Sequence, residues 1–337
     1  MYSFRNDYSE GAHPQIFERL RKISTEQNEG YGLDCHSMRA ELLIKKHLHR
    51  NDASIHFIPG GTQTNLLVIS SFLRPFECVI AADTGHINVH ETGAIEGTGH
   101  KVVTVPHVDG KLTVEGILQV LKQHETEHMV RPAMVYVSNT TELGTVYSKE
   151  ELTKLSKVCK EQGLLFYLDG ARIASALTTL GNDVSLSDYA SLTDLFYIGG
   201  TKNGALFGEA LVICNPSLQA DFRYMIKNRG AMLAKGFITG AQFEVMFEEN
   251  LFFEMGEHAN AMARKIECAL LEKGYTFYAT PCSNQLFPIV DVSYLEKTKD
   301  AFVYNIEKEL DDGRVVIRFV TSFATTEESV DALIHSF

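Results

Sequence analysis

Between about residue 54 and residue 215, short runs of β-branched and aromatic residues alternate with segments whose apolar residues recur at helical spacing. Strands that alternate with helices in this way are typical of a sheet joined by crossover helices. Seven runs are predicted to be strands: SIHFI, CVIAA, KVVTV, AMVYV, LLFYLD, DLFYIGG and ALVIC. The pattern therefore predicts an α/β fold for this part of the chain.

One segment between two of these runs, SKEELTKLSKVCKEQG, is predicted to be an amphipathic helix with caps at both ends. Ser148 lies three residues before Glu151, which is the spacing of a capping box, and Gly163 ends the segment, as glycine often does at a helix C-terminus. Helical spacing places four apolar residues on one face: Leu152, Leu155, Val158 and Cys159.

The order of the pattern changes after about residue 240. A long helical stretch, FEENLFFEMGEHANAMARKIECALLEKG, precedes the runs YTFYA and LFPIVDV, a polar helix near 297–310, the run RVVIRFV and a terminal helix. We predict a large domain over residues 1–245, which includes an N-terminal arm, and a smaller α/β domain over residues 246–337.

Composition and charge narrow the classes of function. The chain has 337 residues, of which 45% are hydrophobic and 22% are charged, as expected for a soluble globular protein with a sizeable core. A formal net charge of −12 without a basic block argues against nucleic acid as a partner. No apolar run approaches the ~20 residues that cross a bilayer, and the start lacks leader features, so no membrane partner and a cytoplasmic location are expected.

The cysteines give no sign of a metal site or of disulfides. None of the six has CxxC spacing, and we interpret them as buried apolar residues. They are Cys35, Cys78, Cys159, Cys214, Cys268 and Cys282.

Two strand ends supply an acid and an amine. Asp169 ends the run LLFYLD and is followed by Gly170, although an Asp-Gly pair is also ordinary turn chemistry. Lys202 follows DLFYIGG among glycines and small residues, with no carboxylate beside it in sequence. With its ordinary pKa of about 10.4, lysine is mostly protonated at neutral pH and is therefore a poor nucleophile. Desolvation in such surroundings would lower that pKa.

A third strand end carries Gly60, Gly61 and Thr62 before a helix predicted to start near Asn65. Free backbone N–H groups, a hydroxyl and a helix N-terminus together suit a phosphate, although a Gly-Gly-Thr loop by itself is more often a tight turn. The chain has neither GxGxxG nor GxxxxGK[ST], which disfavours dinucleotides and nucleoside triphosphates. A phosphate site, an acid for a ring nitrogen and an imine-forming amine are what pyridoxal 5'-phosphate requires.

Several motifs resemble one enzyme family. The segments PGGTQTN, GHINVHETGAIEGTGHKV, SNTTELGT, LDGARIASA, GGTKNG and IRFVT are similar, in this order, to segments of the threonine aldolases of the β-eliminating lyase group. These are pyridoxal-phosphate enzymes of fold type I, the aspartate aminotransferase superfamily. The resemblance implies a large domain with a seven-stranded, mostly parallel mixed sheet and helices on both faces, followed by a smaller C-terminal α/β domain.

The same resemblance implies roles for individual residues. Lys202 would bind the cofactor covalently, Asp169 would pair with its ring nitrogen and His86 would stack on its ring, and these three are the predicted catalytic residues. The phosphate would be held by Gly61, Thr62 and Thr201.

The substrate is predicted to meet a second set of residues. Arg172, which is also expected near the cofactor, and Arg318 would bind the substrate carboxylate, each with parallel N–H donors. His90 and Asn6 complete the predicted substrate-binding set. The reaction implied is retro-aldol cleavage of L-threonine or L-allo-threonine to glycine and acetaldehyde, with His86 or His90, directly or through water, as the base at the β-hydroxyl.

The chain departs from the better-known bacterial pattern at three places, one of which is the segment IKNRGAMLAKG, where an arginine of the pattern's GGGMRQ has no direct match and Lys227, Arg229 or Lys235 would substitute. Thr141 stands where that pattern has a histidine of ENTHN, and His90 stands where it has a tyrosine. Family members are usually tetramers with shared active sites, so we expect a homo-oligomer, a dimer of dimers. Residues that could reach a neighbour's site are Tyr31, Lys227, Arg229 and Lys235.

Three alternatives stay open at this point. His86 and His90 are four residues apart beside Glu91, with His100 as a possible third ligand, which could indicate a metallohydrolase, although the order is not HExxH. A β-lyase or aminotransferase acting on another amino acid would use the same cofactor and fold. An inactive binding protein is the third alternative. We expect no metal.

Overall fold

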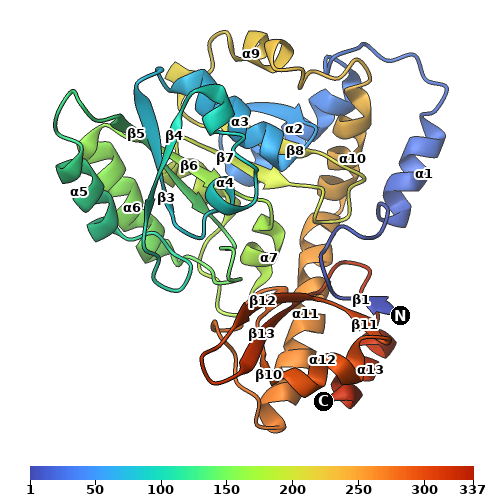
Figure 1. Cartoon of the computed structure of the whole chain (residues 1–337). Coiled ribbons are helices and arrows are strands. Elements are labelled where there is room, and N and C mark those ends of the chain that lie inside the picture. The colour runs from blue at the N-terminus through green and yellow to red at the C-terminus, as the bar shows by residue number, and fades with distance from the viewer.

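The computed structural model describes all 337 residues and places one seven-stranded sheet in the larger, upper part of the molecule (Figure 1). Six strands of this sheet run in the same direction, and only β8 is reversed, since it pairs antiparallel with both of its neighbours. From edge to edge the order is β2 (Ser54–Ile58), β8 (Glu209–Ile213), β7 (Leu195–Gly199), β6 (Leu165–Asp169), β5 (Arg131–Ser138), β3 (Glu77–Ala82) and β4 (Lys101–Val105).

All seven predicted strands belong to this sheet, and each lies within two residues of its predicted bounds. Alternate residues of the strands enter two different hydrophobic clusters, so both faces of the sheet are buried. On β6, for example, Phe166 and Leu168 belong to one cluster and Tyr167 to the other. The predicted α/β fold with a mostly parallel mixed sheet is confirmed.

Helices cover each face. The larger cluster includes residues from α1 (Pro14–Lys22), α2 (Cys35–Leu48), α5 (Val114–Gln123), α6 (Lys149–Gln162), α7 (Ile173–Thr178), α8 (Leu186–Leu192) and α10 (Phe237–Glu248). The other face is covered by α3 (Gly61–Phe72), α4 (His86–Val89) and α9 (Phe222–Asn228), and short 3₁₀ turns lie at Glu96–Thr98 and Pro216–Leu218.

Helix α6 forms as predicted. The Ser148 hydroxyl and the Glu151 carboxylate make the reciprocal bonds of a capping box, and Gly163 ends the helix at φ 66°. Its predicted apolar face is buried. The helix expected near Asn65 begins four residues earlier, at Gly61, so that the glycines form the helix N-terminus itself.

The smaller, lower part contains two short sheets and three helices (Figure 1). β13 (Arg314–Val320) pairs with β10 (Ile289–Asp291), β12 (Asn305–Glu309) and β9 (Gln285–Leu286), and β1 (Tyr2–Ser3) pairs with β11 (Phe302–Val303). The helices are α11 (Leu251–Glu272), α12 (Val292–Thr298) and α13 (Glu327–Ser336). The first residues of the chain therefore lie against its C-terminal part, and the domain boundary at residue 245 stays a prediction.

Two predictions for this part are wrong. The polar helix near 297–310 is not formed, because α12 ends at Thr298 and residues 305–309 pair with β13 as an edge strand whose outward residues are charged. YTFYA makes only an isolated bridge, from Phe277 to Pro288. The predicted long helix is confirmed as α11, although it begins at Leu251, because Asn250 at φ 63° separates the start of the predicted stretch from it.

The cysteines are all free, and Cys78, Cys159 and Cys214 are buried as predicted. Cys35 and Cys268 are exposed, so the interpretation as buried residues is wrong for these two. No helix combines the length and the apolar character needed to span a membrane.

Candidate active site

A cavity of about 310 Å³ lies at the carboxyl ends of β5, β6 and β7, where open α/β sheets place their ligands. Most of the predicted site lines it: Lys202, Asp169, His86, Gly61, Thr62, Thr201 and Arg172. A larger hollow of about 760 Å³ between α5 and α6 contains none of these residues. Strand ends that are far apart in sequence thus meet around one cavity.

Lys202 is half-buried just after β7, and its Nζ makes neither a hydrogen bond nor an ion pair. The ring of Tyr8, from the N-terminal arm, lies 6.0 Å from this nitrogen. Burial lowers the pKa of Lys202 and the charge of Arg172 lowers it further, while the carboxylates of Asp7, Glu142 and Asp169 oppose the shift. A larger fraction of this amine is therefore uncharged at neutral pH than for an ordinary lysine.

Asp169 is buried and accepts four hydrogen bonds. Tyr197 Oη donates to its Oδ1 at 2.5 Å and Tyr136 Oη to its Oδ2 at 2.6 Å. The Ala171 N–H and the Asn65 Nδ2 amide supply the other two, at 3.0 and 3.1 Å. Although burial favours the neutral acid, the charge of His86 and these hydrogen bonds hold the pKa of Asp169 below its ordinary value. The group is a fixed carboxylate.

Sequence reasoning missed the tyrosines that hold Asp169. Tyr136, Tyr167 and Tyr197 each stand two residues before the end of a strand, in VYVS, FYLD and FYIG, and all three point from the same face of the sheet. Tyr167 Oη donates to Asn65 Oδ1 at 2.7 Å and so fixes the amide that bonds Asp169. The threefold repeat of tyrosine at one strand position was the signal available in the sequence.

His86 begins α4 and is held by Glu91, which sequence reasoning assigned only to a possible metal site. His86 Nδ1 lies 2.8 Å from Glu91 Oε1, and the same oxygen accepts from Asn65 Nδ2 at 2.7 Å. Burial opposes the charged ring, but the hydrogen bond to Glu91 and the charges of Glu142 and Asp169 raise the pKa of His86. His100 hydrogen-bonds Thr98 and the Leu73 carbonyl instead of joining a metal cluster.

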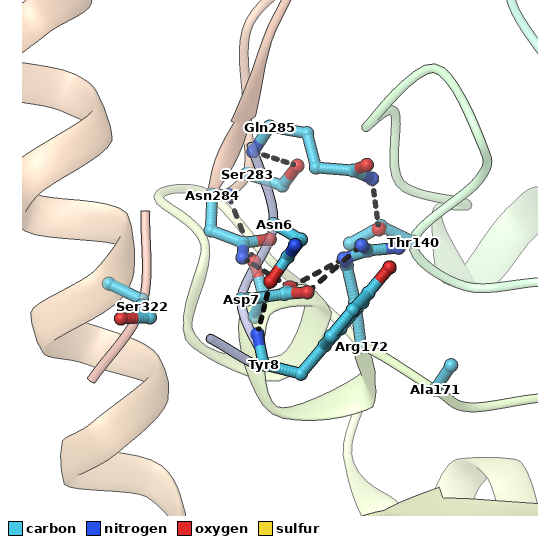
Figure 2. Close-up of polar contacts among 12 residues, drawn as sticks. Asn6, Asp7, Tyr8, Thr140, Ala171, Arg172, Ser283, Asn284, Gln285 and Ser322 are labelled. Carbon is cyan, nitrogen blue, oxygen red and sulfur yellow. Dashed lines mark hydrogen bonds and ion pairs between the residues drawn. The ribbon is translucent and has the colours of Figure 1, made fainter. Parts of the chain in front are cut away.

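Arg172 is paired with Asp7 of the N-terminal arm (Figure 2). Arg172 Nε and Nη2 donate to the two Asp7 oxygens at 2.7 and 3.0 Å, and Asn284 Nδ2 donates to Asp7 Oδ2 at 2.9 Å. Asp7 is buried, and although burial favours its neutral form, the charges of Arg172 and Lys202 hold its pKa below the ordinary value. Asp7 uses one edge of the guanidinium and leaves N–H groups on Nη1 and Nη2 for a second carboxylate.

Three predicted substrate residues do not line the cavity. Arg318 Nε lies 3.2 Å from Glu307 Oε1, an ion pair outside good hydrogen-bond geometry. His90 is exposed, with its ring 5.5 Å from that of His86. Asn6 Oδ1 accepts from the Tyr8 N–H and the Ser9 hydroxyl, so this oxygen stabilises a turn of the arm (Figure 2). The residues named for a neighbour's site also lie outside the cavity of this chain.

The turn after β2 places backbone N–H groups at the cavity. Gly60 is the N-cap of α3, and Gly61 and Thr62 form its first turn, whose N–H groups have no partner within the helix. A Cβ at position 61 would lie 3.1 Å from Tyr197 Oη, so a side chain there would crowd the tyrosine that bonds Asp169. Thr201, the third predicted phosphate ligand, already donates to Glu209 Oε1 at 2.9 Å.

Glu209 is a buried acid on β8 that the sequence pattern did not reveal. Besides Thr201, the Gly200 N–H donates to it at 2.9 Å. Burial raises its pKa from 4.5 to about 7, against these hydrogen bonds and the charge of Lys202. Its protonation therefore changes near neutral pH.

Replacing Glu209 with glutamine is expected to alter how stability depends on pH. Because the pKa in the folded protein lies above its ordinary value, the stabilisation by the protonated acid is complete below about pH 4.5 and is lost as pH rises through 7. Glu209→Gln keeps the neutral form, so it should come close to the wild type at pH 4 and exceed it by up to about 3 kcal/mol at pH 8.5. Unfolding of both cofactor-loaded proteins across this range measures the difference, and a constant difference would contradict the assignment.

Comparisons with known proteins agree with this geometry. Residues 4–292 match the family described as Beta-eliminating lyase. A low specificity L-threonine aldolase of Pseudomonas sp. (strain NCIMB 10558) is 32% identical over 263 residues, 77% of this chain and 76% of the relative. The solved structure of a Leishmania major threonine aldolase has a TM-score of 0.98 at 50% identity and covers 99% of this chain and 98% of its own. A Thermus thermophilus aspartate aminotransferase, at 15% identity and a TM-score of 0.75, covers 100% of this chain and 91% of its own and shares the fold.

Proposed function

Because the chain belongs to the family of β-eliminating lyases, we propose that it is a pyridoxal-phosphate-dependent threonine aldolase. It cleaves L-threonine, or its allo isomer, to glycine and acetaldehyde. The observation that carries this function is the unpaired Lys202 amine at the same cavity as the saturated Asp169 carboxylate. Relatives that cover most of both chains have the same activity in their names.

The residues present fit pyridoxal phosphate. The cavity joins an amine of lowered pKa, a carboxylate that four donors keep ionised and the free N–H groups of a helix N-terminus. We propose that Lys202 holds the cofactor covalently, that Asp169 pairs with its ring nitrogen and that His86 packs on its ring. Gly61 and Thr62 hold the phosphate through their backbone and hydroxyl groups, with Thr201 beside them. The bound cofactor supplies an aldehyde that joins an amine and a ring that withdraws electrons from Cα.

The two arginines are suited to hold a substrate carboxylate. Arg172 and Arg318 each direct Nε toward an acid of the chain, Asp7 and Glu307. Each keeps the Nη end of its guanidinium available, and that end can bind a carboxylate through two parallel N–H groups. We propose that Arg172 binds the substrate carboxylate at the cavity, and that Arg318 and Asn6 approach it from the rim. Fixing the carboxylate decides which bond at Cα is presented for cleavage.

A product assay tests this function. Purified protein loaded with pyridoxal phosphate is expected to release acetaldehyde and glycine in equal amounts from threonine or allo-threonine. An aminotransferase would instead consume an added keto acid, and a β-lyase would release ammonia. Failure to produce glycine from either threonine isomer would reject the proposal.

We also expect copies of the chain to associate as a dimer of dimers. Helix α2 and the turn before it expose three large apolar residues, Leu33, Met38 and Leu42, with 53%, 53% and 67% of their surface accessible. Tyr31 in the same segment lies under Lys227, whose Nζ is 4.6 Å from the ring. We propose that this surface meets a second copy.

A further inference from the structure

Glu142, on the loop that follows β5, is a carboxylate without a partner at the cavity. It is half-buried, lines the same cavity as Lys202 and His86, and takes part in no hydrogen bond or ion pair. Its neighbour Thr141, which sequence reasoning placed at the family's histidine position, points elsewhere. Thr141 Oγ1 lies 2.7 Å from Thr145 Oγ1, and the residue is buried and does not line the cavity.

The other two carboxylates that line the cavity are already engaged. Asp169 accepts four hydrogen bonds, and Glu209 accepts one each from Thr201 and Gly200. Glu142 is therefore the acid of this cavity whose oxygens are all free to accept a proton or a hydrogen bond from a ligand.

Glu142 is also surrounded by basic groups that it does not touch. Its charge is among those that act on the pKa values of His86, His90, Arg172 and Lys202. A partly buried carboxylate without a direct partner is costly unless nearby positive charge offsets the lost hydration. This arrangement leaves Glu142 available at the point where the amine, the ring-stacking histidine and the carboxylate-binding arginine converge.

The histidines are less suited to accept a substrate proton. His86 is hydrogen-bonded at Nδ1 to Glu91 and is assigned to the cofactor ring. His90 is exposed and does not line the cavity.

We propose that Glu142 is the base that accepts the proton of the substrate's β-hydroxyl group and thereby selects β-hydroxy-α-amino acids. This role rests on the proposed aldolase function. The hydroxyl proton passes to a Glu142 oxygen, the hydroxyl oxygen's electron pair forms the C=O bond of the aldehyde, and the Cα–Cβ bond breaks. The electron pair of that bond stays at Cα, where the cofactor, when bound, would supply the electron-withdrawing ring, and a proton then completes glycine.

Glycine as a substrate tests the rest of the site independently of the role proposed for Glu142. Glycine carries the amine and the carboxylate but no β-hydroxyl group. Exchange of its α-hydrogen with D₂O therefore needs the cofactor, Lys202 and Asp169, but no base at the β-position. NMR follows this exchange independently of threonine cleavage.

The test compares Glu142→Gln, Glu142→Asp and the wild type, all loaded with cofactor. Glu142→Gln is expected to lose threonine cleavage by at least about a hundredfold while its cofactor absorbance and glycine exchange stay near the wild type. Glu142→Asp, which keeps a carboxylate, should recover part of the cleavage. Glu115→Gln removes the same charge from the exposed surface of α5 and should leave both reactions unchanged.

Two results would overturn the role of Glu142 alone. One is cleavage by Glu142→Gln within about threefold of the wild type. The other is a parallel loss of glycine exchange, which would place Glu142 in cofactor binding or folding. If the wild type exchanges glycine but does not cleave either threonine isomer, the aldolase function itself fails, and the role of Glu142 fails with it.

Discussion

Replacing Lys202 with alanine is expected to abolish the covalent link between chain and cofactor and to lower threonine cleavage by roughly a thousandfold or more, as when other covalent catalytic groups are removed. Lys202 is the one lysine that lines the cavity, and its amine has no ion pair. Borohydride treatment followed by mass spectrometry of the denatured chain measures the link. The wild type should gain the mass of the reduced cofactor and Lys202→Ala should not.

A matched variant separates nucleophilicity from charge. Lys202→Arg keeps a positive group at the end of β7 but cannot form an imine at neutral pH, because arginine stays protonated. Lys202→Arg should therefore lose both threonine cleavage and the borohydride-stable attachment of the cofactor. Lys122→Ala, on the exposed side of α5, should behave as the wild type. Borohydride-stable attachment of the cofactor to Lys202→Ala would show that another lysine carries the chemistry.

The sheet could be predicted from the sequence because its inner strands are buried on both faces. Runs such as CVIAA and ALVIC are apolar without interruption, which is how strands buried on both faces differ from half-exposed ones. Because the carboxyl ends of parallel strands lie at one edge of the sheet, the pattern predicts that Asp169 and Lys202 meet there. The C-terminal part lacks this signal, since the edge strand β12 is mostly charged and its pattern resembles that of an exposed helix.

The partners of the site residues could not be predicted in the same way. Asp7 lies 165 positions from Arg172, and nothing in its local pattern marks it as a buried residue. Glu142 was hidden for a different reason, because only the turn of the loop decides whether residue 141 or residue 142 faces the cavity. Sequence pattern locates the strand ends, but loop conformation and long-range ion pairs decide which side chains meet there.

The hydrogen bonds around Asp169 explain why a carboxylate, and not only a polar group, is needed at the end of β6. Two tyrosine hydroxyls, one amide and one backbone N–H all donate to it. Four donors around one buried group are compatible with two acceptor oxygens and a full negative charge. In the proposed function that charge would favour a proton on the cofactor's ring nitrogen, and the protonated ring would supply the electron withdrawal from Cα.

Asp169→Asn is therefore expected to keep the cofactor bound through Lys202 but to lower turnover by roughly 10²–10³-fold, the size of effect seen when one electrostatic stabiliser is removed. The amide NH₂ group of the new asparagine would also face hydrogen-bond donors at the place of an acceptor oxygen. This should cost about 1–3 kcal/mol of stability unless a tyrosine hydroxyl turns to accept from it. Cofactor absorbance, kcat and the unfolding temperature measure these effects separately. Tyr197→Phe provides the comparison, because it removes one donor and keeps the charge, so its loss of kcat should be smaller. Turnover by Asp169→Asn within tenfold of the wild type would mean that another group protonates the ring nitrogen.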